Sequence, residues 1–217
     1  MVRTTLTALA LATTTLATAA CGTERTTTAG ARAAAVPSSP EQVRADTLAG
    51  VAKRIYHQEA GGEVGHAAVK RIARDRALLA ALRTQDAPRL RAAALRQLFN
   101  PGKHVARLSV RHGTSTLVNV GGTFVVSPAQ RALPAGLGVL EASMQDVIGY
   151  VKLVHRLSGA QIVVRGAAGH VESSLPSATN ATLPASGQVT LAGRSYVVRS
   201  FPERGYDGEP LTVWVLT

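Results

Sequence analysis

The sequence contains one cysteine and few aromatic residues, and each shortage argues against a class of protein. The 217 residues include one cysteine, which excludes an internal disulfide and any zinc or iron–sulfur site built from several cysteines. Aromatic residues make up 4% of the chain. Because proteins that bind nucleic-acid strands line a basic surface with aromatic rings, we expect no nucleic-acid partner. Beyond the N-terminal region, no apolar run approaches the roughly 18 residues of a membrane helix.

Sequence motifs of catalysis and of cofactor binding are also missing. The chain has no G-x-S-x-G, no P-loop and no dinucleotide-type glycine fingerprint. Its six histidines show no metal-ligand spacing such as H-E-x-x-H. We therefore expect a protein that is not an enzyme and that uses neither a metal nor a cofactor.

The residues that are present predict a folded and strongly basic protein. Hydrophobic residues make up 46% of the chain, which is enough for a packed core. The net charge is +11, and 20 of the 24 basic residues are arginine, a bias that high-GC coding sequences tend to produce. The surface should still favour anionic partners, whether phosphate polymers, lipid headgroups or carboxylates.

The N-terminus predicts export from the cytoplasm. In residues 1–20, Arg3 precedes an apolar run over 6–16, and small residues follow, as in a signal peptide. Cys21 stands where a bacterial lipoprotein is cut and acylated, although Thr18 replaces the leucine that the motif prefers. The alternative is ordinary secretory cleavage after Ala19. Lipidation would hold the protein at the outer face of a membrane, and either alternative places the chain outside the cytoplasm.

Composition divides the mature chain into a tether and a domain. Residues 21–37 consist mainly of Thr, Ala, Arg and Gly without an apolar period, which predicts a flexible tether. We expect a single domain over residues 38–217.

Apolar periodicity predicts helices in the first part of this domain. Ser39, Pro40 and Gln42 form a capping box with proline at the first helical position. Apolar residues then recur at helical spacing until Gly61-Gly62, and a second helical stripe follows over 64–82. A third helix is expected from Asp86 to the stop at 100–102.

After residue 102 the apolar period changes to 2, which predicts strands. Residues 103–112 and 116–120 should form a hairpin, and 123–126 should extend the sheet. A loop over 127–137 and a strand over 137–143 follow, and then a helix with Ser143 as its N-cap. Further short strands are expected at 161–165, 169–174, 188–191, 195–201 and 211–216. The order predicts an α+β domain with a mostly antiparallel sheet.

The order and spacing of several short segments resemble the extracellular Cache (PDC) sensor family, of the single-Cache type, here on a bacterial lipoprotein. The segments are Leu108–Thr116, Val118–Gly122, Val125–Pro128, Ser143–Tyr150, Leu157–Ala160 and Gly193–Tyr196. The resemblance covers residues 39–217. It implies a PAS-like antiparallel sheet with a long N-terminal helix and flanking helices.

The resemblance also implies a small-molecule ligand, such as an amino acid, a carboxylate or an amine, held beneath the loop that follows the hairpin. Arg131 is the one charged residue of that loop and would suit a carboxylate. The loop lacks the Tyr and Trp of the amino-acid-binding branch, so amino-acid recognition is not implied. Tyr150, Asp146 and Arg165 are further ligand candidates. Tyr150 could instead belong to the core, and Asp146 could instead be a first-turn acid favoured by the helix dipole. Arg165 could instead face solvent.

Family members pass their signal through a membrane helix to an output domain, whereas this chain stops in a predicted strand at Thr217. We therefore expect a separate membrane receptor or kinase partner, or a tethered binding protein that delivers its ligand. The alternative hypothesis is an envelope-interaction lipoprotein whose basic helices bind anionic wall polymer or lipid, without a working pocket.

Overall fold

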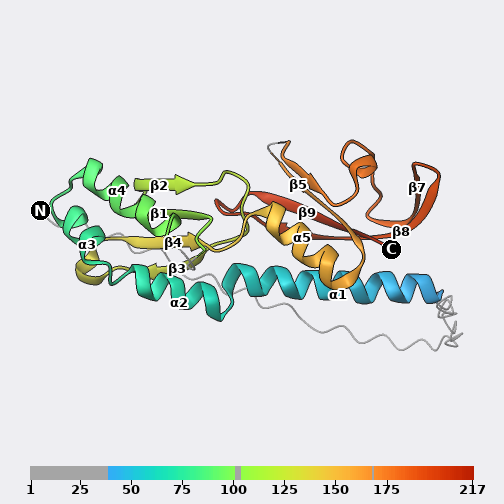
Figure 1. Cartoon of the computed structure of the whole chain (residues 1–217), viewed down its shortest axis with the longest axis horizontal. Coiled ribbons are helices and arrows are strands. Elements are labelled where there is room, and N and C mark those ends of the chain that lie inside the picture. Colours follow the sequence, from blue (N-terminus) through green and yellow to red (C-terminus); the bar gives the residue numbers. More distant parts are fainter. Residues whose placement is uncertain (1–38, 101–103, 168) are drawn as a thin grey trace, which may run out of the picture. The chain divides into compact units, whose positions relative to one another are not determined.

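The computed structural model describes residues 39–100, 104–167 and 169–217. The predicted signal peptide, Cys21 and the tether lie outside the described residues. Helices come first along the chain, and two antiparallel sheets follow (Figure 1).

The long first helix, α1 (Pro40–Gly61), begins with the capping box that the sequence predicts. Ser39 Oγ accepts a hydrogen bond from the Gln42 N–H at 3.3 Å, and Gln42 Oε1 accepts one from the Ser39 N–H at 2.9 Å. The helix ends at Gly62, before α2 (Glu63–Ile72). A Cβ at Gly62 would lie 2.2 Å from the Gln58 carbonyl oxygen, so this close junction requires glycine.

The second predicted helix is in fact two helices. After α2 ends at Ile72, Asp75 caps α3 (Arg76–Arg83) by accepting a hydrogen bond from the Leu78 N–H at 2.8 Å. Both helices bury apolar residues in the same core cluster, so the stripe continues across the break and conceals it. The last of these helices, α4 (Ala87–Leu98), starts at Asp86 as expected.

The strands form two sheets, where we expected one. The four-stranded sheet has the order β2-β1-β4-β3 and the five-stranded sheet the order β6-β5-β9-β8-β7, with all neighbours antiparallel. Their bounds are β1 (Arg107–His112), β2 (Ser115–Gly121), β3 (Ala129–Ala132), β4 (Val139–Ser143), β5 (Gln161–Gly166), β6 (Val171–Ser173), β7 (Ser186–Leu191), β8 (Arg194–Arg204) and β9 (Pro210–Leu216). Alternation predicts that a segment is a strand but not which strand it pairs with.

Two further expectations for this region are wrong. The predicted loop over 127–137 contains the edge strand β3, which buries only Ala129 and so lacks an alternating apolar signal. The predicted strand over 123–126 makes only isolated bridges, Val125 with Asp146 and Val126 with Gly205.

The helix between the sheets, α5 (Val147–Ser158), starts later than predicted. Its N-cap is Asp146, whose Oδ1 accepts a hydrogen bond from the Gly149 N–H at 2.6 Å. Ser143 instead ends β4 and donates to the Gln145 carbonyl at 3.1 Å. Both residue types are good N-caps, and only the strand pairing of Ser143 with Arg107 decides between them.

The hydrophobic core consists of three clusters. One lies between the four-stranded sheet and α2, α3 and α4, and a second joins α1 and α5 to the five-stranded sheet. The third covers the other face of that sheet beneath the segment between β6 and β7. Each helix therefore buries its apolar stripe against a sheet, as α+β domains require.

The turn between β8 and β9 reaches the four-stranded sheet. Tyr206 in this turn donates a hydrogen bond to the Glu141 carbonyl at 3.0 Å, and its hydroxyl lies 3.1 Å from Ser109 Oγ. Burial is the main cause that raises the pKa of Tyr206 to about 12, so the hydroxyl stays protonated at neutral pH. Arg107 on β1 pairs with Asp207 at 3.0 Å beside it.

Candidate functional site

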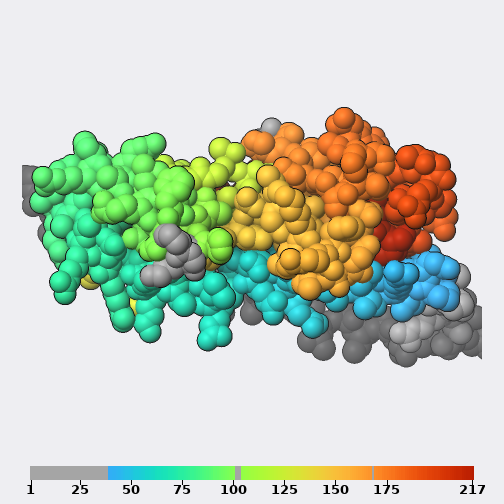
Figure 2. All heavy atoms as spheres, in the orientation of Figure 1, coloured from blue at the N-terminus to red at the C-terminus, as the bar shows by residue number. Residues whose placement is uncertain are grey.

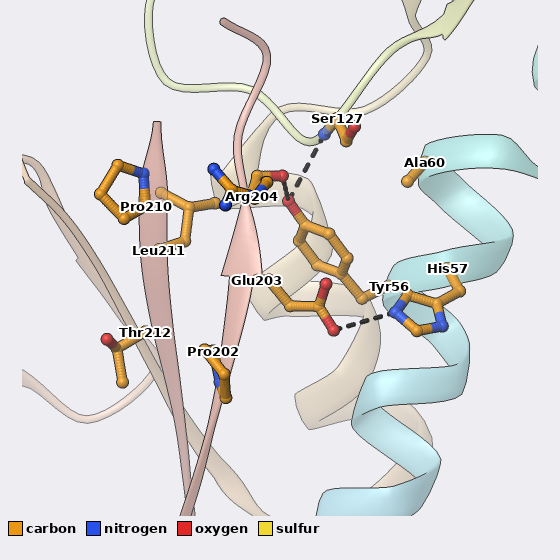
Figure 3. A pocket seen from close by; sticks show the side chains of 10 residues that line it. All are labelled: Tyr56, His57, Ala60, Ser127, Pro202, Glu203, Arg204, Pro210, Leu211 and Thr212. Atoms are coloured by element: carbon orange, nitrogen blue, oxygen red, sulfur yellow. Dashed lines mark hydrogen bonds and ion pairs between the residues drawn. The ribbon is translucent and has the colours of Figure 1, made fainter. Parts of the chain in front are cut away.

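The candidate site is a recess of about 610 Å³ between α1 and the paired strands β8 and β9 (Figure 3). One wall comes from α1 and the other from the facing ends of the two strands, and Ser127 closes the site from the segment before β3. The lining residues are Tyr56, His57, Ala60, Ser127, Pro202, Glu203, Arg204, Pro210, Leu211 and Thr212.

Tyr56 joins the three parts of the recess. Its hydroxyl donates to the Arg204 carbonyl at 2.7 Å and accepts a hydrogen bond from the Ser127 N–H at 3.4 Å. The residue is 1% exposed, and desolvation is the main cause that raises its pKa above the ordinary tyrosine value. The hydroxyl therefore stays a protonated donor at neutral pH, fixing α1 to β8.

Glu203 brings a carboxylate into this recess. Its Oε1 lies 3.0 Å from His57 Nε2, and the Glu203 side chain is 11% exposed whereas that of His57 is 58% exposed. Figure 3 shows the carboxylate turned toward α1. Because little water reaches it, the charge is screened less than a surface charge would be. Oε2 has no hydrogen-bond partner among the described residues.

The remaining wall is mostly apolar. Pro202, Pro210 and Leu211 provide hydrocarbon surface, and Thr212 provides a hydroxyl group. Arg204 donates from Nη1 to the Gly208 carbonyl at 3.2 Å. A recess with one shielded carboxylate, a few hydroxyl groups and apolar walls can bind and orient a small polar molecule.

Tyr150, predicted as a ligand contact, is fully buried in the core. Its hydroxyl donates to the Ala52 carbonyl at 2.9 Å, and its ring packs edge-on against Tyr56 with centroids 5.2 Å apart. Desolvation is the main cause that raises its pKa. The structure thus places Tyr150 directly behind a residue of the recess.

Arg165, the second arginine among the predicted ligand contacts, binds the chain itself. Its Nη2 donates to the carbonyls of Ala178, Thr179 and Ala181, all in the segment between β6 and β7. Its guanidinium also lies over the Trp214 ring, 5.2 Å from the centroid. The geometry gives Arg165 a structural role in holding this segment.

The other two predicted contacts lie apart from the recess. Asp146 caps α5, as described above. Arg131 is exposed on the edge strand β3 opposite Leu140 and has no hydrogen bond or ion pair with a described residue. The four predicted residues are therefore not brought together into one site, and their ligand-binding roles stay predictions.

Sequence reasoning missed Tyr56, His57 and Glu203. Tyr56 follows Ile55 in the apolar stripe of α1, so the pattern predicts a core position for its ring. His57 and Glu203 are 146 positions apart, and no sequence pattern connects residues at that distance. The start of the predicted ligand loop, Ser127, does border the recess.

The described part of the chain offers neither a membrane-spanning helix nor a cluster of metal ligands. Within residues 39–100, 104–167 and 169–217, no helix has the length and hydropathy to cross a membrane. Within the same ranges, no group of three or more His, Cys, Asp or Glu side chains could hold a metal ion.

Comparisons with known proteins find similarity in structure only. No family model matches the sequence, and no curated protein matches it. The chain is similar to the crystal structure of the periplasmic domain of Vibrio cholerae LuxQ, with 13% identity and a TM-score of 0.48, over 80% of this chain and 99% of that one. A selenomethionine crystal structure of the same domain gives 13% identity and a TM-score of 0.46, over 80% and 97%.

A third similar structure is the ligand-binding domain of the Pseudomonas aeruginosa PAO1 amino acid chemoreceptor PctC in complex with GABA. It is 15% identical, with a TM-score of 0.35, over 79% of this chain and 99% of that one. The fold class is confirmed. It is α+β, with a long N-terminal helix and antiparallel sheets.

Proposed function

We propose that this chain is an extracytoplasmic sensor domain that binds a small molecule in the recess between α1 and the β8–β9 strands. The observation that carries the proposal is the shielded Glu203 carboxylate in an apolar-walled recess of about 610 Å³. A volume of this size suits a small ligand. The sensor resemblance in the sequence supports the same assignment.

The chemistry of the recess favours a ligand that carries an amine. Glu203 can accept a charge-assisted hydrogen bond from an ammonium group through Oε2, and Ser127 and Thr212 can bond to polar groups elsewhere on the ligand. The apolar surface of Pro202, Pro210 and Leu211 suits a short hydrocarbon body. A bound ligand would touch α1 and both strands, so it could alter how α1 sits on β8.

We expect α1 to carry the signal from the recess toward the membrane, since it follows directly on the tether predicted over residues 21–37. The lipid on Cys21 would hold the domain at the outer face of the membrane. A membrane receptor or kinase would then read the position of α1 or take over the ligand.

Thermal unfolding of the full chain tests the ligand site. The panel comprises amino acids, amines, carboxylates and nucleobases, with butylamine and butyrate as a pair matched in size. A ligand at 100 times its dissociation constant adds about 2.7 kcal/mol to the free energy of unfolding. We expect amine-bearing compounds to raise the melting temperature, and Glu203→Gln to weaken their binding about 10-fold to 100-fold through loss of a charge-assisted hydrogen bond.

Glu172→Gln is the matched control, because Glu172 lies on β6 at the edge of the same sheet and away from the recess. The control should bind the amines as the unmodified chain does. Equal loss in both variants, or no melting shift with any compound of the panel, would contradict the proposed site.

A second candidate function rests on the charge of α2, α3 and α4. Residues 63–98 contain eight basic and three acidic residues, and seven of the basic side chains are exposed. In Figure 2 these helices, coloured teal to green, form the surface at one end of the domain. Such a surface would bind an anionic wall polymer or lipid, as the alternative hypothesis states. Flat melting across the panel, with salt-sensitive retention on an anionic polymer, would favour it.

The membrane anchor is tested by Cys21→Ala in a bacterial host that processes lipoproteins. Removing the only thiol that could be acylated should move the protein from the membrane fraction to the soluble extracytoplasmic fraction. Fractionation followed by immunoblotting measures the change, with Thr18→Leu as a control that restores the preferred motif and keeps the anchor. Unchanged fractionation of Cys21→Ala would remove the lipid anchor from the proposal.

A further inference from the structure

A second recess, of about 550 Å³, lies beside α2 and is lined in part by Arg71. Val64 and Ala67 contribute apolar surface from the same helix, and Met144 and Gln145 face them from the segment between β4 and α5. None of these residues lines the recess at Tyr56. The two recesses are therefore separate candidate sites.

Part of the Arg71 guanidinium is buried without a hydrogen-bond partner. Its Nε and Nη2 are buried and have no hydrogen-bond partner among the described residues. Burial of an unpaired polar group is costly, and burial of a charged one costs more. Arg71 as a whole is partly exposed, and a ligand that supplied acceptors to its guanidinium would offset the cost of these two unpaired nitrogens.

The acidic residue in the lining, Glu59, does not supply this partner. Glu59 from α1 borders the same recess, yet the ion pairs among the described residues do not include Arg71. Asp75, four residues further on, is engaged as the cap of α3 and accepts a second hydrogen bond from Gln97. No acceptor for the buried Arg71 nitrogens is therefore present within residues 39–100, 104–167 and 169–217.

We propose that this recess binds a small carboxylic acid with a short aliphatic body, through Arg71. The planar guanidinium fork matches the two oxygens of a carboxylate. Because Nη2 is buried, a carboxylate that bonds to both Nη1 and Nη2 requires the Arg71 side chain to turn toward the recess. The apolar surface of Val64, Ala67 and Met144 accommodates the hydrocarbon. A free phosphate would satisfy the fork but would leave this surface uncovered.

Calorimetric titration of the full chain with hexanoate, hexanamide and inorganic phosphate tests the proposal. Hexanoate should bind saturably, whereas hexanamide has the same hydrocarbon without the charge and should not bind measurably. Arg71→Met should weaken hexanoate binding about tenfold or more. Lys70→Met removes the same charge from the adjacent, exposed position and should leave hexanoate binding unchanged.

The unliganded variants separate a ligand site from a structural role. Because Nε and Nη2 make no hydrogen bond with the described residues, Arg71→Met should melt at or above the temperature of the unmodified chain. If it does not fold, Arg71→Lys, which keeps the charge but not the fork, should still lose affinity for hexanoate.

Three results would overturn the proposal. The first is that hexanoate does not bind saturably. The second is that the Arg71 variants bind hexanoate with the same affinity as the unmodified chain. The third is that phosphate, and not hexanoate, binds in a way that depends on Arg71. Glu203→Gln should leave hexanoate binding intact, so the outcome here is independent of the amine site.

Discussion

Replacing Tyr150 by alanine is expected to lower the free energy of unfolding by about 3–5 kcal/mol, as for other large aromatic residues removed from a core. Tyr150 is fully buried, contacts Tyr56 edge-on and packs where α1, α5 and the five-stranded sheet meet. The variant leaves a cavity at this junction and removes the hydrogen bond to the Ala52 carbonyl. Urea unfolding of the full chain followed by circular dichroism measures the loss.

Tyr150→Phe is the control that separates a core role from the ligand role expected from the sequence. It keeps the ring and removes only the hydroxyl, so it should cost about 1 kcal/mol. Amine binding should be retained in this variant, because the hydroxyl faces α1 and not the recess. Loss of ligand binding in Tyr150→Phe at nearly unchanged stability would instead make Tyr150 a direct ligand contact.

Local signals in the sequence predicted the helices well because each depends on neighbouring residues. The capping box at Ser39 and Gln42, and the break at Gly61-Gly62, involve contacts within four residues. The break between α2 and α3 is missed because apolar residues on both sides of it lie in the same core cluster. The other errors arise where distant segments decide. Ser143 and Asp146 are equally suitable N-caps, and β3 is a strand only because β4 lies beside it.

The same distinction explains why the candidate recess could not be found in advance. Tyr56 and Ser127 are 71 positions apart, and His57 and Glu203 are 146 apart. Both contacts depend on how α1 lies on β8, which follows from tertiary packing and not from any local pattern. The resemblance to sensor domains correctly implied a helix against antiparallel strands, but it directed attention to the loop after the hairpin, of which only Ser127 reaches the recess.

The second large effect is expected for Arg165→Met, which should lower the free energy of unfolding by about 2–3 kcal/mol. The three carbonyls at 178, 179 and 181 would lose their shared donor, and Trp214 would lose the cation over its ring. The segment between β6 and β7 should open before the rest of the domain. Hydrogen exchange of residues 174–185 and the fluorescence of Trp214 report this opening.

Arg131→Met is the matched control for this substitution, since the sequence also makes Arg131 a ligand candidate. Arg131 is exposed and unpaired among the described residues, so its removal should change stability by no more than about 0.5 kcal/mol. Equal and small effects of the two substitutions on hydrogen exchange would show that Arg165 does not hold the segment. A small-molecule ligand whose binding is lost only in Arg165→Met, while the segment stays protected, would return Arg165 to the ligand site.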